Sequence, residues 1–250
     1  MSRKQSVPGK HSPESTDVIA KRLPRGNPEL DSGTMSFLAD GARLDGEMKM
    51  PATEAPDKIV IPARMIPFSC RNKEMLTPED AICFYEHEKE WKEVNRTPQL
   101  FVKEFRRQLL VSPDNSVLIN DIPPCQLTNI TKNRLLSSYY QRQFVYTFCN
   151  VRWGGEASYT TEPFGFIPCI IGVPRDSVIA IGSHGCLGDR IRRYHFEAGL
   201  EVVLRELMPR VVLVYGGGDS VYRQYERAIR FVKYSDYESA RRGGAPWVRE

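Results

Sequence analysis

Short apolar runs alternate with helical patterns through most of this chain, and that alternation limits the folds open to it. Five runs read as strands: "QLLVS" around Leu109–Ser112, "FVYTFCNV" (144–151), "SVIAIG" (177–182), "RVVLVYG" (210–216) and "IRFVKYS" (229–235). Between them lie segments with apolar residues at helical spacing, among them 127–143 and 191–208. Parallel strands joined by helical crossovers have this pattern. We therefore predict an α/β fold with four or five parallel strands, as an open doubly wound sheet or an incomplete barrel.

The two ends of the chain lack this alternation. Residues 1–57 are rich in Pro, Gly, Ser and charge, which predicts a flexible tail in which "MSFLADGARL" (35–44) makes one short turn or docks on the body. The remaining predictions are a strand at Lys58–Ile61, a helix over 77–94, a second helical piece over 98–107 and a loose end over 239–250. A single α/β domain then covers residues 58–238.

Composition sets limits on partners and compartment. The 250 residues carry a net charge of +4, which permits a nucleic-acid partner without requiring one. The six cysteines contain no Cys-x-x-Cys pair, which favours reduced thiols in a cytoplasmic protein over a disulfide framework. The first residues have no apolar core of a signal peptide, and no run approaches the ~20 apolar residues of a membrane span, so we expect a cytoplasmic protein without a membrane partner.

Polar and glycine residues follow four of the predicted strands. In both α/β architectures ligands bind at the carboxyl ends of parallel strands, which lie at one edge of the sheet. The loops carry these candidates: Ser112, Pro113 and Asp114; Asn150, Arg152, Trp153 and Gly154; Ser183, His184, Gly185 and Cys186; Tyr215, Gly216 and Gly217. We expect Asp114, Arg152, His184 and Tyr215 to share one rim.

The stretch "VIAIGSHGCLGD" places a histidine and a thiol on a glycine-rich turn before a helix. Histidine is the side chain whose ordinary pKa lies nearest neutral pH, so His184 suits an acid, base or ligand role. Cys186 suits either a substrate-contact or structural role or that of a nucleophile. The glycines, including Gly185, fit either a tight turn or contact with an anion. Neither this turn nor "YGGGDS" after Tyr215 has the spacing of a dinucleotide or ATP-binding loop.

Arg152, Trp153 and Asp114 also have two interpretations each. The Arg152 guanidinium suits a carboxylate or phosphate, and the Trp153 ring offers a face for a base or sugar. Alternatively Trp153 plugs the mouth of the sheet and Arg152 pairs with Asp114, which is then a loop cap and not a general base. His184, Cys186 and Asp189 lie too close in sequence for a well-formed metal site, so no metal is predicted and the cofactor is unknown.

Several of these motifs together resemble a family found in phages, prophages and mobile elements and catalogued as a domain of unknown function. The resemblance covers about residues 60–235 and rests on "SPD", an Asn-to-Arg helix (Asn129, Arg134), "NVRWG", "SHGC" and "VYG". It favours the "LLVSPD" strand over "VLIND" (117–121) and adds Arg134 to the expected ligand-binding set of Trp153, Asn150, Ser183, Gly185, Tyr215 and Gly216. Two departures, Cys149 in place of proline and a longer "EPFGFIPCIIG" (162–172), put the loop beside Trp153 in doubt.

These residues support three hypotheses on function. The leading one is an enzyme that hydrolyses or transfers a group on a nucleotide, nucleoside or nucleic-acid component. In it His184 and Asp114 do acid–base work, Arg152 and the glycine turns hold an anion, and Cys186 lines the pocket. The second is a non-catalytic protein that binds a nucleotide or another protein at the same place. The third is a DNA-binding accessory factor that uses the arginine-rich C-terminal third.

Overall fold

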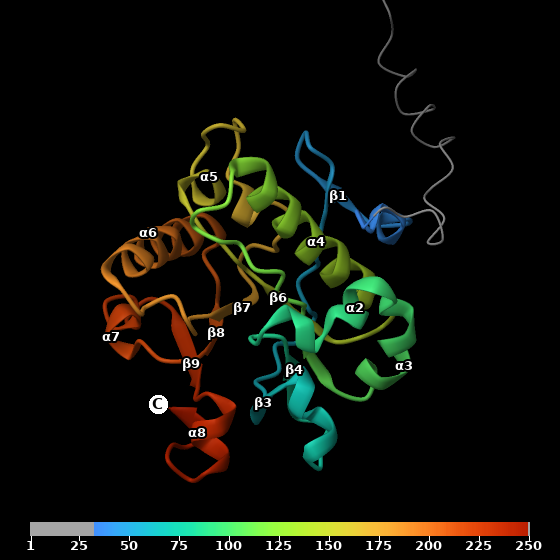
Figure 1. Ribbon diagram of the computed structural model, residues 1–250, viewed down its shortest axis with the longest axis vertical. Coiled ribbons are helices and arrows are strands. Elements are labelled where there is room, and N and C mark those ends of the chain that lie inside the picture. Colours follow the sequence, from blue (N-terminus) through green and yellow to red (C-terminus); the bar gives the residue numbers. More distant parts are fainter. Residues whose placement is uncertain (1–32, 250) are drawn as a thin grey trace, which may run out of the picture.

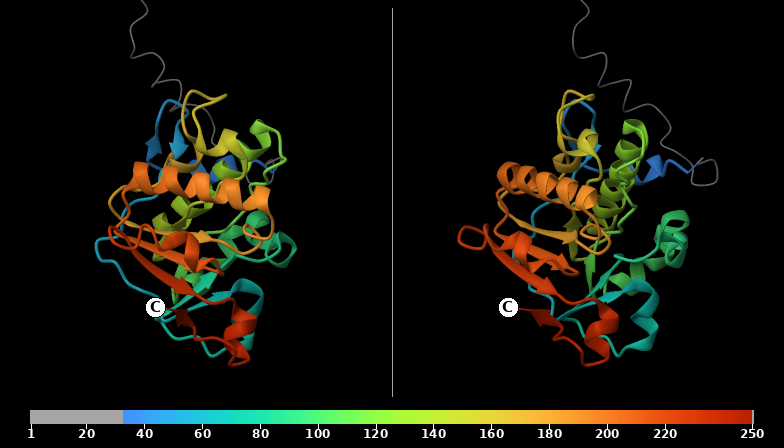
Figure 2. Two further views of the ribbon diagram at one scale, coloured as in Figure 1. Left: turned by 90° about the vertical axis from the view of Figure 1, so that its left-hand side faces the viewer. Right: turned by 60° about the vertical axis from the view of Figure 1, so that its left-hand side comes forward.

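The computed structural model describes residues 33–249 and confirms an α/β fold built on a mostly parallel sheet. Eight strands lie in the order β10-β9-β8-β7-β6-β5-β4-β3, so strands that are neighbours in the sheet follow one another in the chain. Strands β3 to β9 are parallel, and β10 pairs antiparallel with β9. The sheet curls until it is nearly closed as a barrel, with helices α4 and α6 on its outside (Figures 1 and 2). Of the two predicted arrangements, the incomplete barrel is the one observed.

The elements of the sheet are short and regularly connected. Its strands are β3 (Arg64–Pro67), β4 (Asp80–Cys83), β5 (Leu109–Val111), β6 (Thr147–Asn150), β7 (Val178–Gly182), β8 (Val211–Tyr215), β9 (Arg230–Tyr234) and β10 (Val248–Arg249). The helices are α2 (Lys92–Arg96), α3 (Val102–Phe105), α4 (Pro123–Arg142), α5 (Glu156–Tyr159), α6 (Arg190–Leu207), α7 (Asp219–Tyr222) and α8 (Tyr237–Arg241). Single 3-10 turns are η2 (Ser36–Ala39), η3 (Phe68–Lys73), η4 (Glu88–Glu90), η5 (Pro98–Phe101) and η6 (Pro168–Ile170), and β1 (Leu44–Asp45) pairs with β2 (Met50–Pro51).

Alternating side chains build two layers of core. On β7, Val178 and Ala180 face the inside of the barrel, while Ile179 and Ile181 pack outward among the residues of α6. Such a strand is buried on both faces and therefore reads as a continuous apolar run. Helix α6 is well delimited, because Asp189 accepts hydrogen bonds from the first turn and Met208 leaves the helix in a left-handed conformation.

The N-terminal half of the sheet differs from the prediction. Residues 58–61 are not a strand; the first strand is β3, and Ile59, Val60 and Ile61 only pack at the edge of the interior. The predicted helix over 77–94 is also wrong, because Asp80–Cys83 form β4 and helix begins only at Lys92. These two strands raise the parallel strands to seven, more than the four or five predicted.

Packed structure begins earlier and ends later than the sequence indicates. Met35 and Leu38 are buried in the outer core, and Thr53 Oγ1 donates a hydrogen bond to Ser137 Oγ of α4 at 3.0 Å. Part of the segment 35–44 therefore docks on the body, which was one of the two predicted alternatives, and the first 32 residues of the predicted tail lie outside the described residues. The predicted loose end contains most of α8 and all of β10, which is held to β9 by backbone pairing.

Side chains bridge the seam between the end strands β3 and β10. The Arg64 guanidinium lies 5.3 Å from the centre of the Trp247 ring, and Tyr234 Oη donates to the Pro62 carbonyl at 2.7 Å. Helix α8 lies beside β3 and the turn after it (Figures 1 and 2). The C-terminal segment thus covers the seam that backbone pairing leaves open. None of the helices between residues 33 and 249 is long and apolar enough to cross a bilayer.

Candidate functional site

A cavity of about 490 Å³ opens at the carboxyl ends of the parallel strands. Every one of the seven parallel strands supplies part of its wall. The lining residues are Pro67, Ser69 and Cys70; Tyr85, Glu86 and His87; Asp114 and Ser116; Arg152; Gly182 and His184; Tyr215; Asp236, Tyr237 and Glu238. The structure therefore brings Asp114, Arg152, His184 and Tyr215 to a common cavity.

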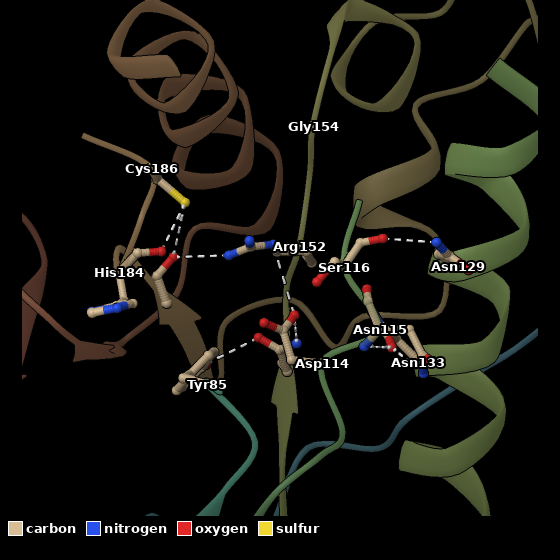
Figure 3. Close-up of polar contacts among 12 residues, drawn as sticks. Tyr85, Asp114, Asn115, Ser116, Asn129, Asn133, Arg152, Gly154, His184 and Cys186 are labelled. Atoms are coloured by element: carbon tan, nitrogen blue, oxygen red, sulfur yellow. Dashed lines mark hydrogen bonds and ion pairs between the residues drawn. The ribbon is translucent and has the colours of Figure 1, made fainter. Parts of the chain in front are cut away.

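Asp114 is buried and held by a chain of polar contacts (Figure 3). Tyr85 Oη donates to Asn150 Oδ1 at 3.0 Å, and Asn150 Nδ2 donates to Asp114 Oδ1 at 2.8 Å. Burial raises the pKa of Tyr85 well above its ordinary value, so its hydroxyl keeps the proton that it donates. The Asp114 carboxylate is thus held in one orientation at the floor of the cavity.

Arg152 lies over Asp114 (Figure 3). Its Nε is 3.8 Å from Asp114 Oδ1, and its Nη1 donates to the Gly182 carbonyl at 3.2 Å. Burial is the largest single effect and disfavours the charged guanidinium, but the carboxylate of Asp114 together with Cys186 and Tyr85 outweighs it, and the pKa of Arg152 is raised. Nε is buried and makes no hydrogen bond with the residues that the structure describes. The ion pair that the sequence offered as an alternative is present, and it leaves donor capacity on Arg152.

Glu86 is a second carboxylate of this cavity and follows β4, which lies two strands along the sheet from β6. It accepts hydrogen bonds from Ser69 N at 2.9 Å and from Ser69 Oγ at 2.5 Å. Burial raises its pKa, against the opposing effect of those two hydrogen bonds. A carboxyl group with a raised pKa holds its proton closer to neutral pH, as a general acid requires.

The turn after β7 separates its histidine from its thiol. The exposed His184 lines the cavity, whereas the Cys186 thiol donates to the Gly182 and His184 carbonyls at 3.7 and 3.6 Å and lies beside Arg152. In Figure 3 the His184 ring and the Cys186 sulfur point in different directions. Gly185 has a φ of +74°, which fits the tight-turn interpretation. The two side chains therefore do not form a nucleophile–base pair.

The loop after β5 is fixed to helix α4. Asn115 N donates to Asn133 Oδ1 at 2.7 Å, and Asn129 Nδ2 donates to the Ser116 carbonyl at 2.7 Å (Figure 3). The "VLIND" segment that follows forms no strand, in agreement with the choice of Leu109–Val111. Because both partners on α4 are side chains of a 20-residue helix, Asp114 stands on a rigid support.

Other predicted ligand-binding residues are occupied within the protein. The Trp153 ring stacks on Phe196 with centroids 5.3 Å apart, and its Nε1 donates to the His195 carbonyl at 3.1 Å. The guanidinium of Arg134 is buried and donates to the carbonyls of Asn150, Cys169 and Ile171. Ser183 Oγ donates to the Gly217 carbonyl at 2.7 Å and so ties its turn to the one that follows Gly216. These contacts hold Trp153, Arg134 and Ser183 in place within the protein.

The two departures from the family pattern lie away from the cavity. Cys149 faces outward from β6 into the core around α6, and the cavity lining contains no residue of 162–172. That segment packs instead on α4 and on the β1–β2 hairpin, where Gly172 N donates to Asp45 Oδ2 at 2.9 Å.

Sequence reasoning missed most of the cavity wall, since only Asp114, Arg152, His184 and Tyr215 of the lining residues were among the predicted candidates. Tyr85, Glu86 and His87 follow β4, which was predicted as helix, and Ser69 and Cys70 follow β3, whose position was also predicted wrongly. Asp236 follows "IRFVKYS", a strand that was predicted, and the strand-end rule applied there would have found it. For β4, the sequence signal that could have been used is the run "AICFY" between charged residues, which suits a short strand buried on both faces.

Within residues 33–249 no group of three or more His, Cys, Asp or Glu side chains has the arrangement of a metal site. All six cysteines are free thiols.

Comparison with known proteins gives one family. The family model described as "Domain of unknown function (DUF4417)" matches residues 42–235. The chain belongs to the DUF4417 family. This confirms the resemblance found in the sequence motifs, and the DUF4417 match begins at residue 42, within the packed segment that precedes β3.

One curated relative is a phage protein. The "Gene 1 protein" of Mycobacterium phage D29 is 30% identical over 107 residues, which is 42% of this chain and 37% of that protein. The aligned part is thus well under half of the relative's length. No solved structure matches the chain.

Proposed function

We propose that this protein hydrolyses the glycosidic bond of a nucleoside or nucleotide, or transfers its glycosyl group to an acceptor, in the cavity at the carboxyl ends of the strands. The observation that carries the proposal is the buried Asp114 carboxylate, oriented by Asn150 and Arg152 and open to a cavity of about 490 Å³. Small-molecule sites have volumes of ~300–1,000 Å³ and occur at this end of α/β barrels.

The charge of the wall favours glycosidic over phosphoester chemistry. Four carboxylates line the cavity against a single guanidinium; they belong to Glu86, Asp114, Asp236 and Glu238. A surplus of carboxylates repels a phosphate and stabilises the positive charge that develops on a sugar ring as its glycosidic bond breaks. Carboxylates also accept hydrogen bonds from sugar hydroxyls.

The residues divide the work of such a step as follows. Asp114 accepts a proton from a water molecule, or from an acceptor hydroxyl, while the oxygen attacks the anomeric carbon of the sugar. The carbon–nitrogen bond breaks and its electron pair goes to the base. Glu86, through its raised pKa, and His184 are the groups that supply a proton to the departing nitrogen. Arg152 orients Asp114.

The experiment incubates the purified protein with adenosine, guanosine, cytidine and uridine and measures free base and ribose by mass spectrometry. Release of base is expected from at least one nucleoside, and Asp114→Asn is expected to lower the rate at least about 100-fold. Glu156→Gln, on the exposed first turn of α5 outside the cavity, is the matched control and keeps the rate. Enrichment of an unchanged nucleoside would instead identify a binding protein, the second hypothesis. A protein that neither releases base nor enriches a nucleoside would contradict both hypotheses.

Many of the arginines in the C-terminal third are paired with carboxylates, which weakens the DNA-binding hypothesis. Arg192, Arg193, Arg205, Arg210, Arg242 and Arg249 each form an ion pair with a nearby carboxylate. Such pairing reduces the positive field that nonspecific DNA binding needs.

A further inference from the structure

A second cavity of about 530 Å³ adjoins the first. The two share Arg152 in their walls. Their linings also continue along two loops, from Ser116 to Val117 and from His184 to Gly185. The cavities are therefore neighbouring compartments at the rim of the barrel, with Arg152 between them.

The second compartment carries different charged groups from the first. Its wall has one carboxylate, that of Asp189, beside the guanidinium groups of Arg152 and Arg192, and two of its apolar side chains are unusually exposed for their type: Leu118 at 56% and Ile191 at 66%. They come from the loop after β5 and from the first turn of α6, yet they border the same space. Trp153 and Phe196 form part of the wall, and Asn120 and His195 supply polar atoms. A ligand with a flat apolar face and a hydrogen-bonding edge fits this combination.

We infer that the second cavity is the subsite for the nucleobase, and that the sugar occupies the first cavity. This inference rests on the proposed function and adds the place of the leaving group. A planar base there lies against the Arg152 guanidinium and covers Leu118 and Ile191. The buried Nε of Arg152 donates no hydrogen bond to the described residues. The glycosidic bond then crosses the boundary between the cavities, next to Asp114.

Binding of nucleosides and of free ribose tests the inference. Titration calorimetry of the full chain with adenosine, guanosine, cytidine, uridine and ribose is expected to give at least about tenfold tighter binding for one or more nucleosides than for ribose. Leu118→Glu and Ile191→Glu are each expected to weaken nucleoside binding about tenfold or more and to leave ribose binding unchanged. Both side chains are exposed, so the substitutions leave the core intact.

Leu100→Glu is the matched control, because Leu100 is 72% exposed and lines neither cavity. Equal affinity for nucleosides and ribose, unchanged nucleoside affinity in both cavity variants, or no nucleoside binding to the natural chain would each overturn the inference. Failure of the proposed catalysis gives a different result. In that case Asp114→Asn leaves the rate of base release unchanged, while nucleosides still bind more tightly than ribose.

Discussion

Asp114 and Glu86 are carboxylates of one cavity in different surroundings. Asp114 has a guanidinium beside it and an amide donor fixed by Tyr85, whereas Glu86 has only the hydrogen-bond donors of Ser69. Burial dominates for Glu86 and raises its pKa. A carboxyl group whose pKa is raised by its surroundings suits the role of the acid in acid–base catalysis.

The raised pKa of Glu86 predicts a pH-dependent effect of Glu86→Gln on stability. A carboxyl group with a raised folded-state pKa contributes most stability below its unfolded-state pKa, near 4, and that contribution is lost as the pH rises through the folded-state pKa. Relative to the natural chain, Glu86→Gln therefore gains stability with rising pH over that window, by up to about 1 kcal/mol since the group is partly hydrated.

Urea denaturation between pH 4 and pH 8 measures the difference. The surface substitution Glu79→Gln removes the same charge and serves as control. A constant difference between Glu86→Gln and the natural chain across this range would show that Glu86 titrates as it does in the unfolded chain.

The sequence predicted best those strands and helices whose residues are buried evenly along the length of the element. β7, β8 and α6 have long apolar runs or clear end signals, and the sequence places all three within about a residue. β4 has four residues, and Ile82, Tyr85 and Trp91 around it happen to share a helical face. Short strands and helices cannot be separated by periodicity over so few positions. The missed strands account for the missed residues of the cavity.

Packing between α6 and the loop after β6 gives a prediction for Gly199. A Cβ at this position would lie 2.2 Å from Trp153 Cδ1 and 2.3 Å from its Nε1. Helix propensity alone favours alanine by about 1 kcal/mol, but the clash outweighs it, and Gly199→Ala is expected to destabilise the protein by about 1–3 kcal/mol.

Thermal or urea denaturation reports this change, with Gly188→Ala as the control because no atom lies within 4 Å of its added Cβ. A stabilised Gly199→Ala protein would mean that the Trp153 ring can move aside. The wall of the second cavity, which Trp153 lines, would then move with it.

The molecule as a whole depends on segments outside the regular βα alternation. The chain from Met35 to Thr53 crosses α4, and Arg142 donates to the carbonyls of Leu38 and Asp40. At the other end, Trp247 meets Arg64 across the seam. Composition alone marked both segments as loose, because their few apolar residues are spread among charges and glycines. Their burial depends on surfaces that form only once the barrel is built.

Leu38→Ala tests whether the N-terminal segment stabilises the whole molecule. Leu38 is 2% exposed in the core around α4, so its truncation is expected to lower the free energy of unfolding by about 2–4 kcal/mol. Met48→Ala in the same segment removes a 56% exposed side chain and is expected to change it by less than about 0.5 kcal/mol. Chemical denaturation compares the two, and equal small effects would show that the segment docks without contributing to stability.

The order of the strands in the sheet follows their order in the chain, so each connection spans only two adjacent strands. One connection can therefore grow without passing over any other. The long connection between β6 and β7 illustrates this, since residues 162–172 extend over α4 and line neither cavity. In such an architecture, substrate preference can diverge through the replacement of a single loop, while six other strand ends keep their side chains in position.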